Sequence, residues 1–156
     1  MNIKKTMLAL AATLGMTAAV LGFAEDPNVG SWKLNQAKSK IAPNVARNVT
    51  VNYTAVGDTY KCVVDGLDAA GKPSHNEWTG KFDGKDYPVT GDPLSDTRSV
   101  KLVTPGHYVI GNKKGGKATL DGTVDFSPDQ KTRTLITRGT DAAGKKTTAT
   151  AVYERQ

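Results

Sequence analysis

Cysteine is nearly absent from this chain, which has a single one among its 156 residues. One cysteine cannot form an internal disulfide, so the fold depends on packing and hydrogen bonding alone. That residue, Cys62, stands in Tyr60-Lys61-Cys62-Val63-Val64, a segment whose composition is typical of a strand. We predict a buried and inert thiol, although a reactive thiol remains the other interpretation.

Histidine and the larger aromatic residues are also scarce, with two histidines, three phenylalanines and two tryptophans. The chain has no nucleophile elbow, no phosphate-binding glycine loop and no paired Cys-x-x-Cys motif, which mark hydrolases, nucleotide-binding proteins and zinc sites. The formal net charge of +6 comes from dispersed basic residues, unlike the clusters of nucleic-acid-binding proteins. We therefore predict that the protein is not an enzyme, holds no metal or cofactor and binds no nucleic acid.

Only the N-terminus contains a long apolar run. Lys4 and Lys5 precede an apolar stretch over residues 7–20, and small residues that suit signal-peptidase cleavage follow it. The stretch is shorter than the ~20 residues needed to span a bilayer, and no comparable run occurs downstream. The pattern predicts a cleavable signal peptide over 1–24, one mature domain over 25–156, and no stable membrane insertion after cleavage. The expected location is periplasmic or secreted.

Alternation of apolar and polar residues dominates the mature chain. It is clearest over residues 117–126, where every second residue is small or apolar. Turn sequences rich in Gly, Asp and Pro separate such segments at intervals of about ten residues, and no amphipathic helix pattern interrupts them. We predict an all-β protein, a single up-and-down antiparallel β-barrel of about 8–10 strands, because closing the first strand onto the last removes the free edges of an open sheet.

One octapeptide occurs twice. Residues 65–72 match residues 138–145 at six of eight positions, and both copies contain Asp-Ala-Ala-Gly-Lys. One interpretation is that the same hairpin turn is used twice, with Asp accepting backbone N–H groups and Gly adopting a positive φ. The other is a duplicated half-barrel.

Two stretches have no strand pattern. Residues 35–47 suit one helical turn or a loop across a barrel end. Residues 83–96 contain Pro88 and Pro93, which exclude a central strand. Because binding residues are concentrated on loops, residues 83–96 are the better candidate for a functional loop.

The two ends of the mature chain resemble the calycin superfamily, which includes lipocalins and fatty-acid-binding proteins. Gly30-Ser31-Trp32-Lys33-Leu34 is similar to the Gly-x-Trp opening of the first strand in both families. Residues 150–155 are similar to the final strand of fatty-acid-binding proteins, which typically reads Thr-Arg-Val-Tyr-Glu-Lys. Residues 30–35 and 81–88 also resemble strings in secreted bacterial lipocalin-like proteins.

The resemblance implies a barrel whose end is closed by a cation over Trp32. Either Arg155 or Lys33 suits this role, with a cation–π contact of roughly 0.5–2 kcal/mol. The resemblance also implies an Arg-x-Tyr pair that holds a ligand carboxylate on the last strand. Here the arginine position is Ala151, while Tyr153 remains, so this chain departs from the fatty-acid clamp.

These observations favour an exported lipocalin-like barrel that binds a small apolar or amphipathic molecule in its interior. The aromatic residues expected to line the binding cavity are Tyr60, Trp78, Phe82, Tyr108, Phe126 and Tyr153. One alternative is a non-catalytic envelope or inhibitor-type module that acts through its loops. Another is an enzyme that uses His75 and Glu77 as acid and base, since residues two apart on a strand share a face. The sequence identifies no partner protein.

Overall fold

The computed structural model describes residues 25–141 and 143–156, so the predicted signal peptide over 1–24 lies outside the described residues. These residues form ten strands and one 3-10 turn, η1 (Gln36–Lys38). The strands are β1 (Gly30–Leu34), β2 (Arg47–Val56), β3 (Thr59–Leu67), β4 (Pro73–Gly80), β5 (Tyr87–Thr90), β6 (Thr97–Thr104), β7 (His107–Lys114), β8 (Lys117–Phe126), β9 (Thr132–Thr140) and β10 (Lys146–Arg155).

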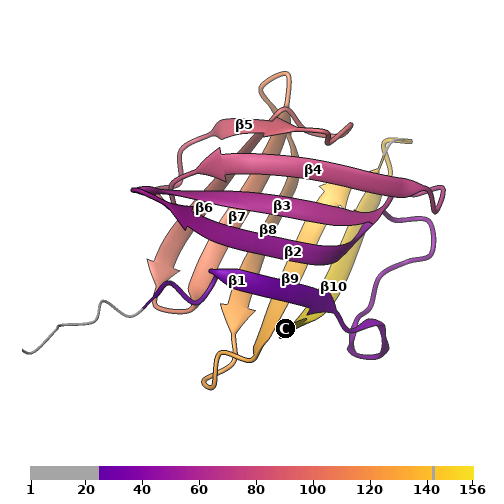
Figure 1. Ribbon diagram of the computed structural model, residues 1–156. Helices are drawn as coiled ribbons and strands as arrows, with labels where there is room; N and C mark the ends of the chain where they lie inside the picture. Colours follow the sequence, from indigo (N-terminus) through magenta and orange to yellow (C-terminus); the bar gives the residue numbers. More distant parts are fainter. Residues whose placement is uncertain (1–24, 142) are drawn as a thin grey trace, which may run out of the picture.

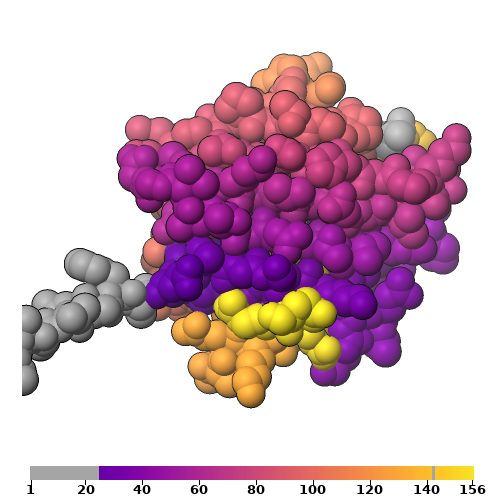
Figure 2. Space-filling model, in the orientation of Figure 1, coloured from indigo at the N-terminus to yellow at the C-terminus, as the bar shows by residue number. Residues whose placement is uncertain are grey.

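The strands form one closed antiparallel barrel, in which neighbours in sequence are neighbours in space and β1 pairs with β10. At this closing pair Trp32 lies opposite Arg155, and Leu34 lies opposite Tyr153. Strands β1–β5 form the near wall in Figure 1, and β6–β10 cross behind them at a steep angle. Figure 2 shows the yellow C-terminal residues lying along the indigo N-terminal strand. The predicted up-and-down barrel is confirmed.

The period-two pattern decides which side chains point inward. In β8, Gly122 and Val124 are buried, whereas Asp121 and Asp125 on either side of them are exposed. The buried apolar side chains of all strands meet in one core that fills the barrel. Cys62 belongs to this core at 1% exposure, and burial raises the pKa of its thiol. The thiol is therefore buried as the sequence predicted.

The repeated octapeptide forms the same hairpin turn twice. Asp68 Oδ1 accepts the backbone N–H groups of the residues two and four positions on, both at 2.9 Å. Asp141 Oδ1 does the same at 3.0 and 2.9 Å. Gly71 and Gly144 end the two turns with φ of 78° and 80°. The turns join β3 to β4 and β9 to β10, six strands apart, whereas halves of a ten-stranded barrel would be five apart. The repeat is therefore a reused turn.

The expectation that residues 83–96 are irregular, with prolines that exclude a central strand, is wrong in part, because β5 lies within this stretch and pairs on both sides. Pro88 is paired with Thr97 of β6, and the two pairs with β4 involve other residues, Val89 and Thr90. Proline lacks only the N–H donor, so a short strand tolerates it at a position where no ladder bond needs that donor. The strand completes the barrel between β4 and β6.

Gly122 stands where β8 and β9 approach most closely. A Cβ at this position would overlap the backbone carbonyl oxygen of Ile136, which cannot rotate away. We expect Gly122→Ala to lower the free energy of unfolding by about 1–3 kcal/mol, measured by urea denaturation. Gly111→Ala is the control, because its Cβ would meet the Ser99 hydroxyl at 3.2 Å, a side-chain group that can rotate, and the Leu120 carbonyl oxygen only at 3.9 Å. Equal stability of the two variants would contradict this account.

No helix within residues 25–141 and 143–156 has the length and hydropathy that a membrane span requires.

Candidate functional site

The segment that precedes β1 crosses one end of the barrel, and we call residues 25–29 the strap. Arg155, at the end of β10, holds it in place: Nη1 donates to the Val29 carbonyl oxygen at 2.8 Å, and Nη2 donates to that of Pro27 at 2.8 Å. Trp32 Nε1 donates to the Asn28 carbonyl oxygen at 3.0 Å. The first and last strands thus anchor the strap together.

Arg155 also covers the indole of Trp32. Its guanidinium carbon lies 4.3 Å from the ring centroid, within cation–π range. Lys33, the other cation considered for this position, is exposed and lies opposite Glu154 in the β1–β10 pair. The structure therefore places Arg155 over Trp32 at the strap end of the barrel.

A network of aromatic side chains fills the end of the barrel that the strap crosses, on the inner side of the strap. Phe82, in the loop between β4 and β5, stacks on Tyr60 with ring centroids 4.0 Å apart. It meets Tyr108 edge to face at 5.4 Å, Tyr108 meets Phe126 at 5.8 Å, and Phe126 meets Trp32 at 5.3 Å. The backbone holds the loop in place, since the Leu102 N–H donates to the Phe82 carbonyl oxygen at 3.1 Å.

A hollow of about 510 Å³ opens between the strap and this network. Three of the six residues expected to line a cavity line it: Tyr60, Tyr108 and Phe126. The other three, Trp78, Phe82 and Tyr153, are not among the residues that line it. The rest of its lining comes from the strap and from the ends and turns of β6–β9: Glu25, Asp26, Pro27, Leu102, Pro105, Gly106, Ser127, Pro128 and Gln130.

Tyr108 carries the polar group at the base of the hollow. Its hydroxyl donates to Asp26 Oδ1 at 2.7 Å, which ties β7 to the strap. Burial raises the pKa of Tyr108, and the hydrogen bond to Asp26 raises it further. Burial also raises the pKa of Tyr60, with a smaller contribution from the Asp26 charge. Both phenols are therefore neutral at physiological pH, and Asp26 supplies the negative charge.

Arg133 lies in the core beneath this network and was not among the predicted site residues. Only 4% of it is exposed. Its guanidinium carbon lies 5.5–5.9 Å from four ring centroids, those of Trp32, Tyr53, Phe126 and Tyr153. Among residues 25–141 and 143–156, no side chain forms a salt bridge with it, and its Nε and Nη1 atoms have no hydrogen-bond partner. A buried cation with two free donors is the most unusual feature of the interior.

The tyrosines beside Arg133 are neutral. Burial raises the pKa of Tyr153 to about 12, against the opposing effect of the Arg133 charge. The Tyr153 hydroxyl donates to the Asn48 carbonyl oxygen at 3.2 Å. Burial also raises the pKa of Tyr53 strongly. Neither phenol supplies a negative charge to Arg133, so these two rings interact with it only through cation–π contacts.

A second arginine, the partly buried Arg98, has both hydrogen-bond and ion-pair partners. Its Nε donates to Asn112 Oδ1 at 3.1 Å, and its Nη2 donates to Asn76 Oδ1 at 3.3 Å. Asp92 Oδ2 lies 3.7 Å from Nη2, and Ser95 donates to the same oxygen. This polar cluster stands near the β5–β6 loop, away from the strap. Arg98 thus has a carboxylate and two amide oxygens within reach, whereas Arg133 forms no ion pair among the described residues and its Nε and Nη1 have no hydrogen-bond partner.

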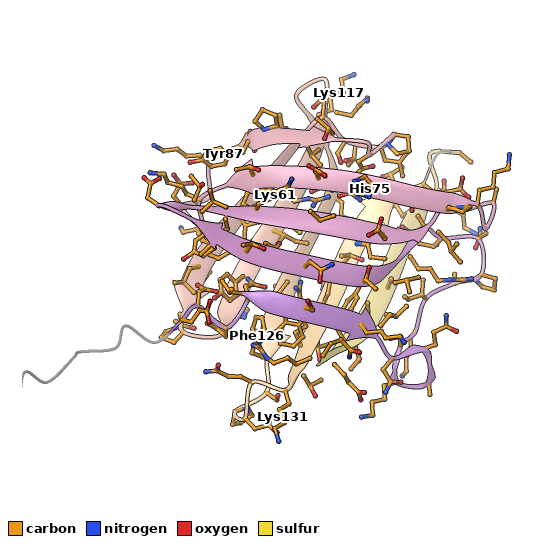
Figure 3. All side chains as sticks on the ribbon, in the orientation of Figure 1. Lys61, His75, Tyr87, Lys117, Phe126 and Lys131 are labelled. Carbon is orange, nitrogen blue, oxygen red and sulfur yellow. The ribbon has the colours of Figure 1, made fainter. Side chains whose placement is uncertain are left out.

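His75 and Glu77 lie outside the site. His75 Nε2 is 3.4 Å from Glu77 Oε1, and His75 Nδ1 is 2.7 Å from Asp65 Oδ1. The hydrogen bonds to Asp65 and then Glu77 raise the pKa of His75. Figure 3 labels His75 and Lys61 on the outer face of the near wall, and Glu77 pairs with Lys61 at 2.9 Å. Within the described ranges, no three His, Cys, Asp or Glu side chains are arranged to hold a metal ion.

Comparisons with known proteins return barrels of low similarity. No protein-family model and no curated protein matches the chain. The EF1p2_mFAP2b protein bound to DFHBI is 12% identical, with a TM-score of 0.47, over 83% of this chain and 94% of that chain. A fluorescence-activating β-barrel of de novo design is 13% identical, with a TM-score of 0.42, over 82% of this chain and 93% of that chain. Apocrustacyanin C1 is 14% identical, with a TM-score of 0.44, over 85% of this chain and 63% of that chain.

The pairing of the chain ends agrees with the expectation from the sequence. The barrel is an antiparallel meander in which the Gly-x-Trp strand β1 pairs with the last strand, as the resemblance of the chain ends implied.

Proposed function

We propose that this protein is an exported, non-catalytic barrel that binds one small, largely apolar molecule in the hollow at the strap end. The observation that supports it is the hollow of about 510 Å³, walled by Tyr60, Tyr108 and Phe126. Ligand sites of small molecules are typically concavities of this size with aromatic walls and few polar groups. The aromatic faces remove apolar ligand surface from water, which is the main source of affinity.

The strap gives the hollow one adjustable wall. Its residues Glu25, Asp26 and Pro27 line the hollow, and three side chains from the barrel hold it: Arg155, Trp32 and Tyr108. The opposite walls are regular strands and tight turns. A ligand therefore enters beside the strap, where Glu25 and Asp26 line the hollow. A periplasmic or secreted location suits a carrier of a poorly soluble molecule.

The pair His75 and Glu77 does not support an enzymatic function. Both side chains are engaged with Asp65 and Lys61 on the outer face, while the hollow opens at the barrel end. A general acid or base must lie within hydrogen-bond reach of the substrate proton it transfers. The residues that line the hollow include no histidine.

Titration with the neutral dye N-phenyl-1-naphthylamine tests the proposed site. We expect saturable binding to one site, and Tyr60→Ala to weaken it about tenfold, since stacking on one ring contributes roughly 1 kcal/mol or more. Tyr87→Ala is the matched control: Tyr87 is also half-buried and packs on Trp78, but does not line the hollow. Equal losses of dye affinity in both variants would contradict the placement of the binding site in the hollow. No dye binding to the wild type would contradict the proposed binding function.

Protein purified from its native source tests the compartment and the cargo. N-terminal sequencing of the secreted or periplasmic fraction should begin at Glu25, the first residue of the strap. Native mass spectrometry should show one retained small molecule per chain. Protein found only in the cytoplasm with its leader intact would contradict the export proposal, and an empty barrel would favour action through the loops.

A further inference from the structure

We infer that Arg133 is the anchor for a single negative charge on the ligand, which makes the ligand class a flat aromatic monoanion. This inference rests on the proposed function and deepens it. It begins with the charges inside the barrel. Arg98 faces Asp92 and two amide oxygens, whereas no carboxylate of the described residues pairs with Arg133.

The aromatic cage only partly compensates this buried charge. Four rings stand within 5.9 Å of the Arg133 guanidinium carbon, and ring faces attract a cation. They do not replace hydrogen-bond acceptors, and Nε and Nη1 have none. Leaving buried charged donors unsatisfied is costly, so groups of this kind occur where a ligand completes them. An anion is the ligand group that supplies both the charge and the acceptors.

The hollow and Arg133 are separated by one side chain, Phe126. Its ring lines the hollow and lies 5.9 Å from the guanidinium carbon, and Phe126 is paired with Arg133 between β8 and β9. Phe126 is half-buried, whereas Trp32, Tyr53 and Tyr153 on the other sides are buried. Figure 3 labels Phe126 at this end of the barrel. Arg133 itself does not line the hollow, so a ligand there reaches the guanidinium only if the Phe126 ring moves aside.

The residues around the hollow favour a ligand with one negative charge and a flat aromatic ring system. Arg133 supplies one positive charge, and the strap lines the hollow with Glu25 and Asp26, which repel any negative charge that Arg133 does not compensate. The Tyr108 hydroxyl already donates to Asp26, so Arg133 has the free donors. The walls are the rings of Tyr60, Tyr108 and Phe126, which favour stacking with an aromatic body.

A pair of dyes with the same ring system tests this inference. 8-Anilinonaphthalene-1-sulfonate carries one negative charge, and N-phenyl-1-naphthylamine is its neutral counterpart. We expect the wild type to bind the sulfonate about 10- to 100-fold more tightly in calorimetric titrations, the effect of a charged hydrogen bond. Arg133→Met should remove that advantage and leave the affinity for the neutral dye within about twofold. Arg133→Lys should retain part of it.

Arg138→Met is the matched control, because Arg138 lies on the same strand but is exposed. It should bind both dyes as the wild type does. The urea midpoint of Arg133→Met should stay or rise, since an apolar side chain replaces an unpaired buried charge. A lower midpoint with equal loss of both dyes would mean that Arg133 serves only the fold and would overturn the inference. Sulfonate binding unchanged in Arg133→Met would also overturn it. Absence of binding of both dyes to the wild type would instead refute the proposed function.

Discussion

Trp32→Ala is expected to lower the free energy of unfolding by about 3–5 kcal/mol, the range for truncating a buried tryptophan. Trp32 is 1% exposed and stands between Arg155 and Phe126, with ring contacts at 4.3 and 5.3 Å. Its Nε1 also donates to the Asn28 carbonyl oxygen in the strap. Small domains have a total stability of roughly 5–15 kcal/mol, so this one change removes a large part of it.

Urea denaturation followed by far-ultraviolet circular dichroism measures this effect, because the substitution removes one of only two tryptophan fluorophores. Trp32→Phe keeps a ring in the core but removes the donor to Asn28, so its loss should be smaller, about 1–2 kcal/mol. Val109→Ala is the exposed control, at 42% exposure, and should change the stability by less than about 0.5 kcal/mol. A loss below about 1 kcal/mol for Trp32→Ala would show that β1 is not essential to barrel closure.

The barrel could be predicted because its signals are local. Alternation and turn residues are visible in short windows, and the edge problem of an open sheet favours closure. β5 was missed because Pro88 weakens the strand pattern, and only the pairing with β4 and β6 shows that its absent donor is not needed. Strand pairing between distant segments is not encoded in any one window of sequence.

The site could be predicted less well, for a reason that Arg133 illustrates. In β9 the apolar residues Leu135 and Ile136 are adjacent, so alternation does not tell which face points inward. The inward face, which includes Arg133, follows only from the pairing of Arg133 with Tyr153 and Phe126. Phe82 and Tyr153 are not among the residues that line the hollow, and alternation alone does not tell which inward-pointing ring reaches it.

Arg155→Met is the second large effect that we expect, a loss of about 2–4 kcal/mol of unfolding free energy. The substitution removes three hydrogen bonds from one guanidinium, to the carbonyl oxygens of Val29, Pro27 and Gln130 at 2.8, 2.8 and 3.0 Å. Bonds from a charged donor contribute roughly 1.5–3 kcal/mol each when buried, and partial exposure reduces that sum here. The cation over Trp32 is lost as well.

Because these hydrogen bonds hold the strap, Arg155→Met should loosen the strap itself as well as lower the stability of the whole barrel. Arg155 holds the strap by two carbonyl groups, so in Arg155→Met the strap should detach before the barrel unfolds. Amide exchange of Val29, whose N–H donates to the Asp26 carbonyl oxygen at 2.9 Å, should then accelerate far more than exchange within β7. Arg155→Lys is the matched control, because lysine keeps the charge above Trp32 but cannot donate in a fixed fork to two carbonyls. It should therefore retain stability between the wild type and Arg155→Met. If both variants protect Val29 as the wild type does, the strap is held by Tyr108 and Trp32 alone, and Arg155 does not control the wall of the hollow.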